Sequence, residues 1–268
     1  MKAYVTLLST GSYYDGVVAL SRSLQMVSSR YPLYVAISQG VSDAVCDKLI
    51  SQDINIIKLG NTVNIPEGST QTIMPHWSYT FDKLQIWGLS QFEKLVFLDS
   101  DMMVVRNIDH LFDKEPFSAV AADCSYPGNE GWAGGLNSGL MVIEPNKDVE
   151  NSLVQMAESV IKDFQMNGKS VGDQDVIKAY CKEWAISLNL HLDEGYNIFA
   201  DHITYYVRNL GYSLSSKGDK PIYVVHFIGK FKPWMNFGIK DIVRFLVNIF
   251  KNPYYLQIFN KYKTLYNK

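Results

Sequence analysis

The chain has 268 residues, of which 47% are hydrophobic and 19% charged, and this composition excludes an intrinsically disordered protein. The formal net charge of −2 and the pI near 6.2 give no basic field for binding nucleic acid. The three cysteines are widely spaced and fit neither a disulfide framework nor a zinc site, and no apolar run reaches the ~18 residues of a membrane-spanning helix.

The first sixty residues alternate between strand and helix patterns. Strands are predicted at residues 3–8, 32–38 and 54–59, separated by two helices with apolar residues at helical spacing, the second over residues 42–51. A βαβαβ order of this kind predicts a parallel sheet with helices on both faces. Gly11 stands alone rather than in a Gly-x-Gly-x-x-Gly turn, and there is no Walker-type loop, so nicotinamide- and ATP-binding motifs are excluded.

The same alternation continues beyond a long polar loop at residues 61–76. The predicted helices cover residues 79–89, 107–112 and 148–164, with a short one beginning at Gly172–Asp175, and the predicted strands cover residues 95–98, 118–122, 137–143 and 221–225. No internal repeat or linker divides this part of the chain. The fold class predicted from these elements is α/β, with a mostly parallel sheet flanked by helices.

The apolar run at residues 95–98 ends in two carboxylates, Asp99 and Asp101, separated by Ser100. A short, fully buried strand belongs to a parallel sheet, where ligands bind beyond the carboxyl ends of strands. In an extended chain Asp99 and Asp101 point to the same side. Two carboxylates about 4 Å apart repel by roughly 4 kcal/mol at an effective dielectric constant near 20, so this pair favours a divalent cation. The alternative is a polar turn after a strand.

His226 follows the last predicted strand and completes a candidate metal site with the two carboxylates. Two carboxylates and one imidazole suit Mn²⁺ better than Ca²⁺, which prefers oxygen ligands alone. Beyond His226, Gly229 permits close approach of a backbone, and Lys232 offers a positive charge to a phosphate. The alternative for His226 is a buried, hydrogen-bonded histidine without a metal.

Several stretches in this order and spacing carry a resemblance that covers roughly residues 3–235. They are Tyr4-Val5-Thr6-Leu7 with Tyr13 and Gly16, Phe81-Asp82-Lys83-Leu84-Gln85-Ile86-Trp87, Leu98-Asp99-Ser100-Asp101, Asn107-Ile108-Asp109-His110-Leu111-Phe112, Leu136-Asn137-Ser138-Gly139, Gly172-Asp173-Gln174-Asp175 and His226-Phe227-Ile228-Gly229-Lys230-Phe231-Lys232-Pro233-Trp234. The chain resembles the family 8 retaining glycosyltransferases of the glycogenin-like and bacterial lipooligosaccharide galactosyl- and glucosyltransferase-like types. The resemblance implies a GT-A fold, a Mn²⁺ site with Mg²⁺ as the alternative metal, and a UDP-glucose or UDP-galactose donor.

The resemblance also implies a role for each matching residue. It assigns the metal to Asp99, Asp101 and His226 and the reaction centre to Asp173, Gln174 and Lys83. The residues implied to bind the nucleotide-sugar are Leu7, Ser9, Thr10, Tyr13, Lys83, Ser100, Asp123, Asn137, Ser138, Asp173, Gln174, Gly229 and Lys232. Structural alternatives remain for six of these residues: helix-start packing for Tyr13, a solvated lysine for Lys83, a plain turn at Asn137 and Ser138, and a helix N-cap at Asp173 and Gln174.

The family implies retention of anomeric configuration, through a short-lived ion pair or a covalent intermediate. The acceptor would be a glycan, a glycolipid or a protein, and a homodimer is compatible with the sequence. This chain has Gly229-Lys230 where bacterial members often have Gly-Pro. Tyr196, Tyr205 and Tyr206 are the available tyrosines for self-glucosylation of the glycogenin type.

Residues 239–268 are predicted to form a basic, aromatic helical tail after a glycosyltransferase domain at residues 1–238. The tail has six Lys or Arg and one Asp, a net charge of 6 − 1 = +5. Such a helix favours the surface of an anionic membrane, and the alternative is a terminal helix packed on the domain. We therefore expect a cytoplasmic protein. If the tail does bind a membrane, we expect peripheral contact with its inner face and a lipid-linked acceptor.

Two other classes of function remain as alternatives. A Mg²⁺-dependent phosphatase of the haloacid dehalogenase type also carries Asp-x-Asp after an apolar strand, but it expects Thr or Val where this chain has Met103. A non-catalytic nucleotide-sugar-binding protein would share the donor site but lack turnover.

Overall fold

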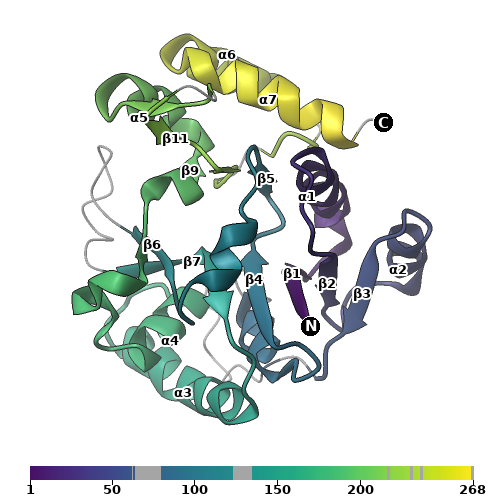
Figure 1. Ribbon diagram of the computed structural model, residues 1–268, viewed down its shortest axis with the longest axis vertical. Helices are drawn as coiled ribbons and strands as arrows, with labels where there is room; N and C mark the ends of the chain where they lie inside the picture. The colour runs from purple at the N-terminus through teal and green to yellow at the C-terminus, as the bar shows by residue number, and fades with distance from the viewer. Residues whose placement is uncertain are drawn as a thin grey trace.

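A computed structural model describes residues 1–61, 63, 80–122, 135–215, 218–229, 232–235 and 238–266 (Figure 1). The strands are β1 (Lys2–Leu8), β2 (Leu33–Ile37), β3 (Asn55–Lys58), β4 (Lys94–Leu98), β5 (Met102–Val104), β6 (Ala119–Ala122), β7 (Gly135–Ile143), β8 (His191–Leu192), β9 (Ile198–Phe199), β10 (Tyr212–Ser213), β11 (Lys220–Pro221) and β12 (Val224–His226). The α-helices are α1 (Tyr14–Met26), α2 (Asp43–Ile50), α3 (Lys147–Met166), α4 (Asp173–Tyr180), α5 (Ile203–Asn209), α6 (Ile239–Lys251) and α7 (Pro253–Tyr266).

The main sheet has the strand order β3-β2-β1-β4-β7-β6-β8. The first four of these strands are parallel, whereas β7 runs antiparallel to both β4 and β6. The predicted α/β class and the βαβαβ start are confirmed. Because β7 is antiparallel to β4, its first residues lie beside the carboxyl end of β4, where the Asp-x-Asp stretch begins.

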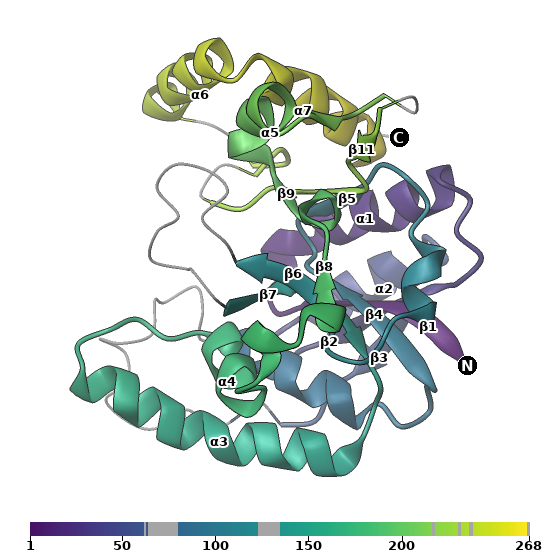
Figure 2. The same cartoon turned by 60° about the vertical axis from the view of Figure 1, so that its left-hand side comes forward.

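Helices cover both faces of this sheet (Figure 2). Successive residues of a strand point to opposite faces, so Val5 packs toward α3 and α4 while Tyr4 packs toward α1. The amphipathic α3 buries Leu153, Ala157 and Ile161 against the first face. Each face therefore has its own apolar cluster, and the sheet is buried on both sides as its apolar strands require.

Four predicted elements differ in detail from the structure. The helices expected at residues 79–89 and 107–112 are 3-10 helices, η3 (Thr80–Gly88) and η4 (Asp109–Asp113). The strand expected at residues 221–225 is divided into β11, which ends at Pro221, and β12. Between them, Ile222 N donates to the carbonyl of Ser213 and Tyr223 N to that of Gly195. The tail is two helices rather than one, because Pro253 begins α7 after Asn252 ends α6.

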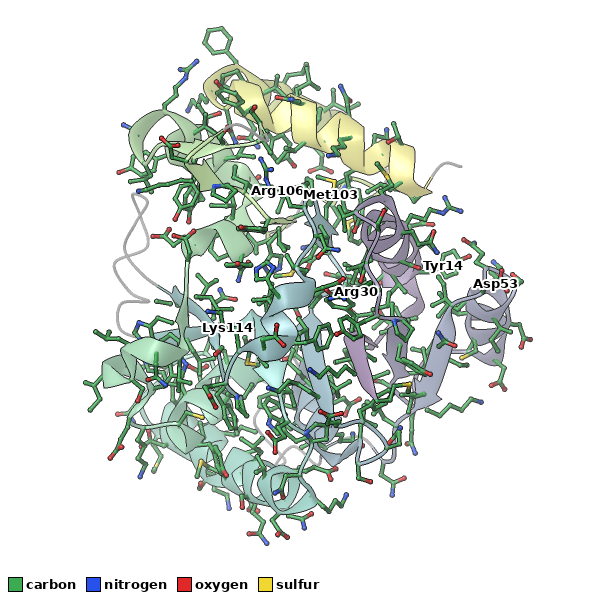
Figure 3. The ribbon with its side chains drawn as sticks, in the orientation of Figure 1. Tyr14, Arg30, Asp53, Met103, Arg106 and Lys114 are labelled. Atoms are coloured by element: carbon green, nitrogen blue, oxygen red, sulfur yellow. The ribbon has the colours of Figure 1, made fainter. Side chains whose placement is uncertain are left out.

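A small second sheet, β5-β12-β9, connects the main sheet to the last helices. It shares an apolar cluster with α5 and α7, to which Met103 of β5, Val225 of β12 and Tyr262 of α7 belong. Met103 is labelled in Figure 3. Helix α7 also packs along α1, where Arg22 Nη1 donates to the carbonyl of Leu265 at 2.6 Å. The charges of α7 lie outward, so this helix matches the packed alternative for the tail.

Within the described residues, no helix is long and apolar enough to cross a membrane. The two described cysteines, Cys46 and Cys181, are free, while Cys124 lies outside the described residues.

Candidate active site

The Asp-x-Asp stretch forms a turn between β4 and β5, in which Met102 N donates to the carbonyl of Asp99. The expected extended conformation is therefore wrong. The turn nevertheless brings the carboxylates of Asp99 and Asp101 together with His226, whose ligand atoms all lie within 4.8 Å of one another. His226 reaches them because β12 pairs with β5, with His226 opposite Met102.

Asp101 is the more strongly paired carboxylate. Its Oδ1 lies 3.0 Å from His226 Nε2, and its Oδ2 accepts a hydrogen bond of 2.5 Å from Lys232 Nζ. Burial alone would raise the pKa of Asp101, but the adjacent Lys232 ammonium and His226 hold it well below the usual range. Asp101 is therefore an anion at any physiological pH.

The pKa of Asp99 is shifted in the opposite direction, upward. Burial raises the pKa of this carboxyl, and the Lys83 ammonium at 3.1 Å from Oδ1 opposes that shift. A second cation beside Asp99 would favour its ionised form further. The two carboxyls thus have unequal proton affinities, and a divalent ion between them would favour the ionised form of both.

Lys83 is the cation at the centre of the site. Its Nζ lies 3.1 Å from Asp99 Oδ1 and 2.9 Å from Asp173 Oδ2, and the residue is 4% exposed. Although burial disfavours the charged form, these two carboxylates raise the pKa of Lys83 above its ordinary value. The solvated-lysine alternative for Lys83 is wrong, since η3 points the side chain inward.

Asp173 and Gln174, at the start of α4, both contact the beginning of β7. Ser138 Oγ donates to Asp173 Oδ2 at 2.8 Å, and Ser138 N donates to Gln174 Oε1 at 3.1 Å. The N-cap alternative for these two residues fails, because it is Asp175 whose side chain accepts from the backbone N–H of Gly172. Asp173 and Gln174 are thereby directed toward Lys83 and Ser138 instead.

The segment around Lys232 packs against the start of α1. Trp234 Nε1 donates to the carbonyl of Ser12, and the Trp234 ring lies edge-on to Tyr13 with centroids 5.5 Å apart. The Lys232 ammonium lies 5.8 Å from the centre of the Tyr13 ring. Gly16 permits this approach, since a Cβ there would lie 2.6 Å from the Ser100 carbonyl and 2.9 Å from the Trp234 ring.

The other predicted donor-binding residues surround the same region or lie outside the description. Leu7 and Ser9 lie at the carboxyl end of β1, and Thr10 Oγ1 shares a 2.7 Å hydrogen bond with Ser12 Oγ. Asn137 precedes Ser138 on β7, Ser100 is buried in the turn, and Gly229 is exposed in a left-handed conformation with φ +82°. Asp123 and Lys230 lie outside the described residues.

Sequence reasoning missed Asn197, which contacts both His226 and Asn137. Its role depends on its position directly before β9, the strand that pairs with β12, and the sequence does not show this pairing. No motif marks it, because an isolated asparagine before two apolar residues has no specific pattern.

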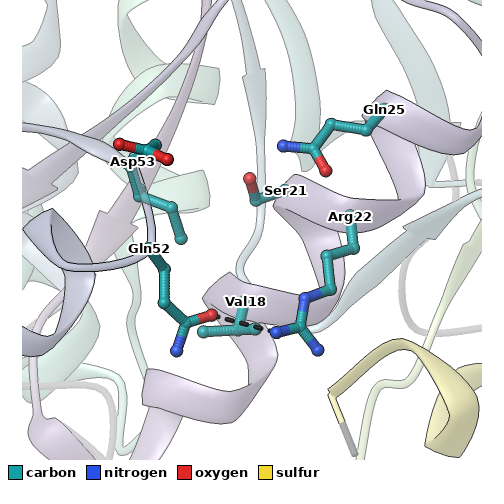
Figure 4. Close-up of a pocket in the computed structure, with 7 residues that line it drawn as sticks. Val18, Ser21, Arg22, Gln25, Gln52 and Asp53 are labelled. Atoms are coloured by element: carbon teal, nitrogen blue, oxygen red, sulfur yellow. Dashed lines mark hydrogen bonds between the residues drawn. The ribbon is translucent and has the colours of Figure 1, made fainter. Parts of the chain in front are cut away.

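A separate pocket lies between α1 and the turn before β3 (Figure 4). Its lining residues are Val18, Ser21, Arg22, Gln25, Gln52, Asp53 and Ile54. Arg22 Nη2 donates to Gln52 Oε1 at 3.1 Å across it. None of the candidate site residues lines this pocket, so it does not belong to the site.

Comparison with known proteins identifies similar sequences over most of the chain. The family model described as Glycosyl transferase family 8 matches residues 4–238. Human glycogenin-1 is 30% identical over 237 residues, covering 87% of this chain and 62% of the relative, and Caenorhabditis elegans glycogenin-1 is 32% identical over 237 residues, covering 87% and 51%. The chain thus spans less than two thirds of the length of these relatives.

Solved structures share the fold at low sequence identity. The galactosyltransferase LgtC, in complex with donor and acceptor sugar analogues, superposes with a TM-score of 0.66 at 15% identity, covering all of this chain and 95% of the other. The glycosyltransferase GlyE of Streptococcus pneumoniae has a TM-score of 0.60 at 17% identity, covering all of this chain and 63% of the other. The predicted GT-A fold is confirmed.

Proposed function

Because the chain belongs to glycosyl transferase family 8, we propose that it transfers a hexose, glucose or galactose, from a UDP-sugar to an acceptor with retention of anomeric configuration. The observation that carries this proposal is the convergence, at the carboxyl end of β4, of a three-residue ligand set with the Lys83–Asp173 pair. Galactosyl transfer is also the activity in the name of LgtC, whose fold this chain shares. The phosphatase alternative has no such support.

We propose Mn²⁺ as the resident metal, with Mg²⁺ as the alternative. Asp99, Asp101 and His226 offer two carboxylates and one imidazole within 4.8 Å, a mixed oxygen and nitrogen donor set that suits Mn²⁺. When bound, the metal would supply positive charge to the departing diphosphate. Lys232 would add to it: an ammonium has three donors, so its contacts with Asp101 and the Phe227 carbonyl still allow one to a phosphate oxygen.

The remaining residues would act on the sugar. Bond breaking leaves positive charge on the sugar ring, and the Asp173 carboxylate with the Gln174 amide would stabilise it. Lys83 holds Asp173 in place through a 2.9 Å ion pair while also contacting Asp99, so it connects the sugar end of the site to the metal end.

The uridine would be bound by a different group of residues. Tyr13, beside Lys232, would stack on the uridine, with Leu7, Ser9 and Thr10 around it.

The acceptor we propose is a glycan, a glycolipid or a protein. Two of the three tyrosines considered for self-glucosylation are buried: Tyr196, which contacts His110, and Tyr206, which packs on Tyr212. Tyr205 is half-buried. An external acceptor is therefore favoured over self-glucosylation at these positions.

We also propose that α6 contacts an anionic membrane peripherally. It exposes Ile242, Val243, Leu246, Val247 and Phe250 along one side, with Phe250 91% exposed. Residues 239–268 have a net charge of 6 − 1 = +5. An apolar helix face in a basic segment has the two properties that bind a helix to anionic lipid.

The proposed transfer is tested with a panel of UDP-sugars, by measuring Mn²⁺-dependent release of UDP. Asp173→Asn should reduce turnover by orders of magnitude with nearly unchanged UDP affinity, since its role is at the sugar. Asp101→Ala should abolish Mn²⁺-dependent UDP binding in calorimetry. Equal UDP affinity of the natural protein with and without Mn²⁺ would contradict the metal assignment, and binding without release would indicate a non-catalytic protein.

A further inference from the structure

A buried chain of side-chain amides ends on the imidazole of His226. Gly139 N donates to Asn137 Oδ1 at 2.9 Å, and Asn197 Nδ2 donates to the same oxygen at 2.8 Å. Asn197 Oδ1 in turn lies 2.9 Å from His226 Nδ1. Asn137, Asn197 and His226 are 8%, 3% and 6% exposed, so water competes little for these contacts. We call these three residues the amide relay.

The polarity of the amide relay is set at one end by the backbone. A backbone N–H can only donate, so the Asn137 atom facing Gly139 N must be the oxygen. The Asn197 atom that faces this oxygen must then be the amide nitrogen. That leaves the Asn197 oxygen for His226, and an oxygen that can only accept requires Nδ1 to carry a proton.

The close packing of these side chains requires a glycine at position 139. A Cβ on Gly139 would lie 2.9 Å from His226 Cε1 and 3.0 Å from both Asn137 Oδ1 and Asp99 Oδ2. The backbone of β7 therefore passes against the edge of the imidazole ring. The pairing of β9 with β12 brings Asn197, directly before β9, to the other side of that ring.

We propose that Asn197 is a positioning residue, which fixes His226 with the proton on Nδ1 and presents Nε2 to the metal. Nε2 already lies 3.0 Å from Asp101 Oδ1, on the side of the two carboxylates. Outer hydrogen-bond partners of this kind fix the tautomer and orientation of metal-binding histidines. Asn137 thereby orients Asn197, in addition to the donor-binding role that the family resemblance implies for it. This inference rests on the metal site of the proposed function.

The test is a direct measurement of metal binding, without turnover. Asn197→Ala should weaken Mn²⁺ affinity, measured by electron paramagnetic resonance of free Mn²⁺, by roughly 10–100-fold. The matched control is Asn252→Ala. Asn252 is similarly buried, at 4% exposed. Its side chain accepts a hydrogen bond from Thr204 N and donates to the carbonyls of Ala200 and Asp201. The Asn252→Ala substitution should lower the stability of the protein and leave its Mn²⁺ affinity unchanged. An equal loss of Mn²⁺ affinity in both variants would overturn the positioning role of Asn197.

A second measurement needs no variant and so does not depend on Asn197→Ala folding. Nitrogen-15 NMR of the natural protein loaded with Cd²⁺, a diamagnetic substitute, should show His226 protonated at Nδ1 and cadmium-coupled at Nε2. The chain has five histidines, few enough to assign. Coupling at Nδ1 would overturn the inference. Absence of transfer from every UDP-sugar would refute the proposed function but would change neither readout.

Discussion

Replacement of Lys83 by methionine tests whether this residue organises the site. Methionine keeps an unbranched chain of similar length but removes the ammonium that contacts Asp99 at 3.1 Å and Asp173 at 2.9 Å. Both carboxylates would then share a buried region with one cation fewer. Since Lys83 also lies 4.6 Å from the centre of the Phe97 ring, the methionine would still have an apolar surface to pack on.

The expected loss follows from the cost of leaving buried charges unpaired. Breaking a buried ion pair by removing one partner costs about 3–5 kcal/mol, and here a single substitution affects two pairs. We expect Lys83→Met to lower the free energy of unfolding by at least the lower part of that range. Adding Asp173→Asn removes one of the two uncompensated carboxylates, so the double variant should be more stable than Lys83→Met alone.

Urea unfolding followed by tryptophan fluorescence measures these differences, and UDP release measures the activity of each variant. The double variant should recover stability but not transfer, because Asp173 is absent. Lys162→Met is the matched control, since Lys162 pairs with Glu158 at the surface and should leave the unfolding midpoint nearly unchanged. If Lys83→Met unfolds at the same urea concentration as the natural protein, the assignment of Lys83 as the charge centre is refuted.

Three further predictions concern the turn, the fold and the tail. Gly16→Ala should lower the free energy of unfolding by about 1–3 kcal/mol and weaken UDP binding in calorimetry, since the added Cβ would meet the Ser100 carbonyl. An unchanged UDP affinity would contradict this prediction. Asp109 accepts hydrogen bonds from Tyr4 OH, Ser29 Oγ and Arg30 N, and although burial opposes it, these donors hold the pKa of Asp109 below its ordinary value. Asp109→Ala should therefore lower the free energy of unfolding by about 1.5–3 kcal/mol at pH 7, measured by thermal or urea unfolding. The difference in stability from the natural protein should shrink as pH falls below about 4, and a pH-independent difference would contradict the prediction. Phe250→Glu should reduce co-sedimentation with phosphatidylserine vesicles at low salt, whereas Ile186→Glu, at a position 80% exposed on another surface, should not; equal binding by both variants would remove the support for a membrane role of α6.

Local patterns were enough to predict the main sheet and the position of the candidate site. The apolar run before Asp99 predicted a buried strand, and β4 occupies residues 94–98 between β1 and β7. The antiparallel direction of β7 could not be read from its own residues, because a fully buried strand has the same pattern in either direction. That direction places Ser138 opposite the Asp-x-Asp turn.

The contacts within the site depend on pairings between distant residues, and sequence spacing does not report these. Lys83 had the pattern of a helix lysine, but η3 is buried along most of its length, and the sequence pattern did not show this. Asn197 carried no motif because its role depends on the pairing of β9 with β12. The apolar spacing in the tail was visible, but the pattern did not separate a helix packed on the domain, as α7 is, from one with an exposed face, as α6 has. The division of the chain at residue 238 stays a prediction.

The packing of α7 beside α1 has a consequence for synthesis of the protein on the ribosome. Tyr262 stacks on Trp234 at 5.7 Å, and Leu265 accepts from Arg22, so the wall behind Lys232 is complete only after residue 265 has emerged. At 5–20 residues per second, the roughly 40 residues from His226 to Leu265 take about 2–8 s. During that interval every metal-ligand candidate has been made, while the apolar surface that α7 covers is open to water and to chaperones. Chains that end before α7 and chains that include it contain the same site residues. A difference in chaperone binding between them would therefore come from the apolar surface that α7 covers.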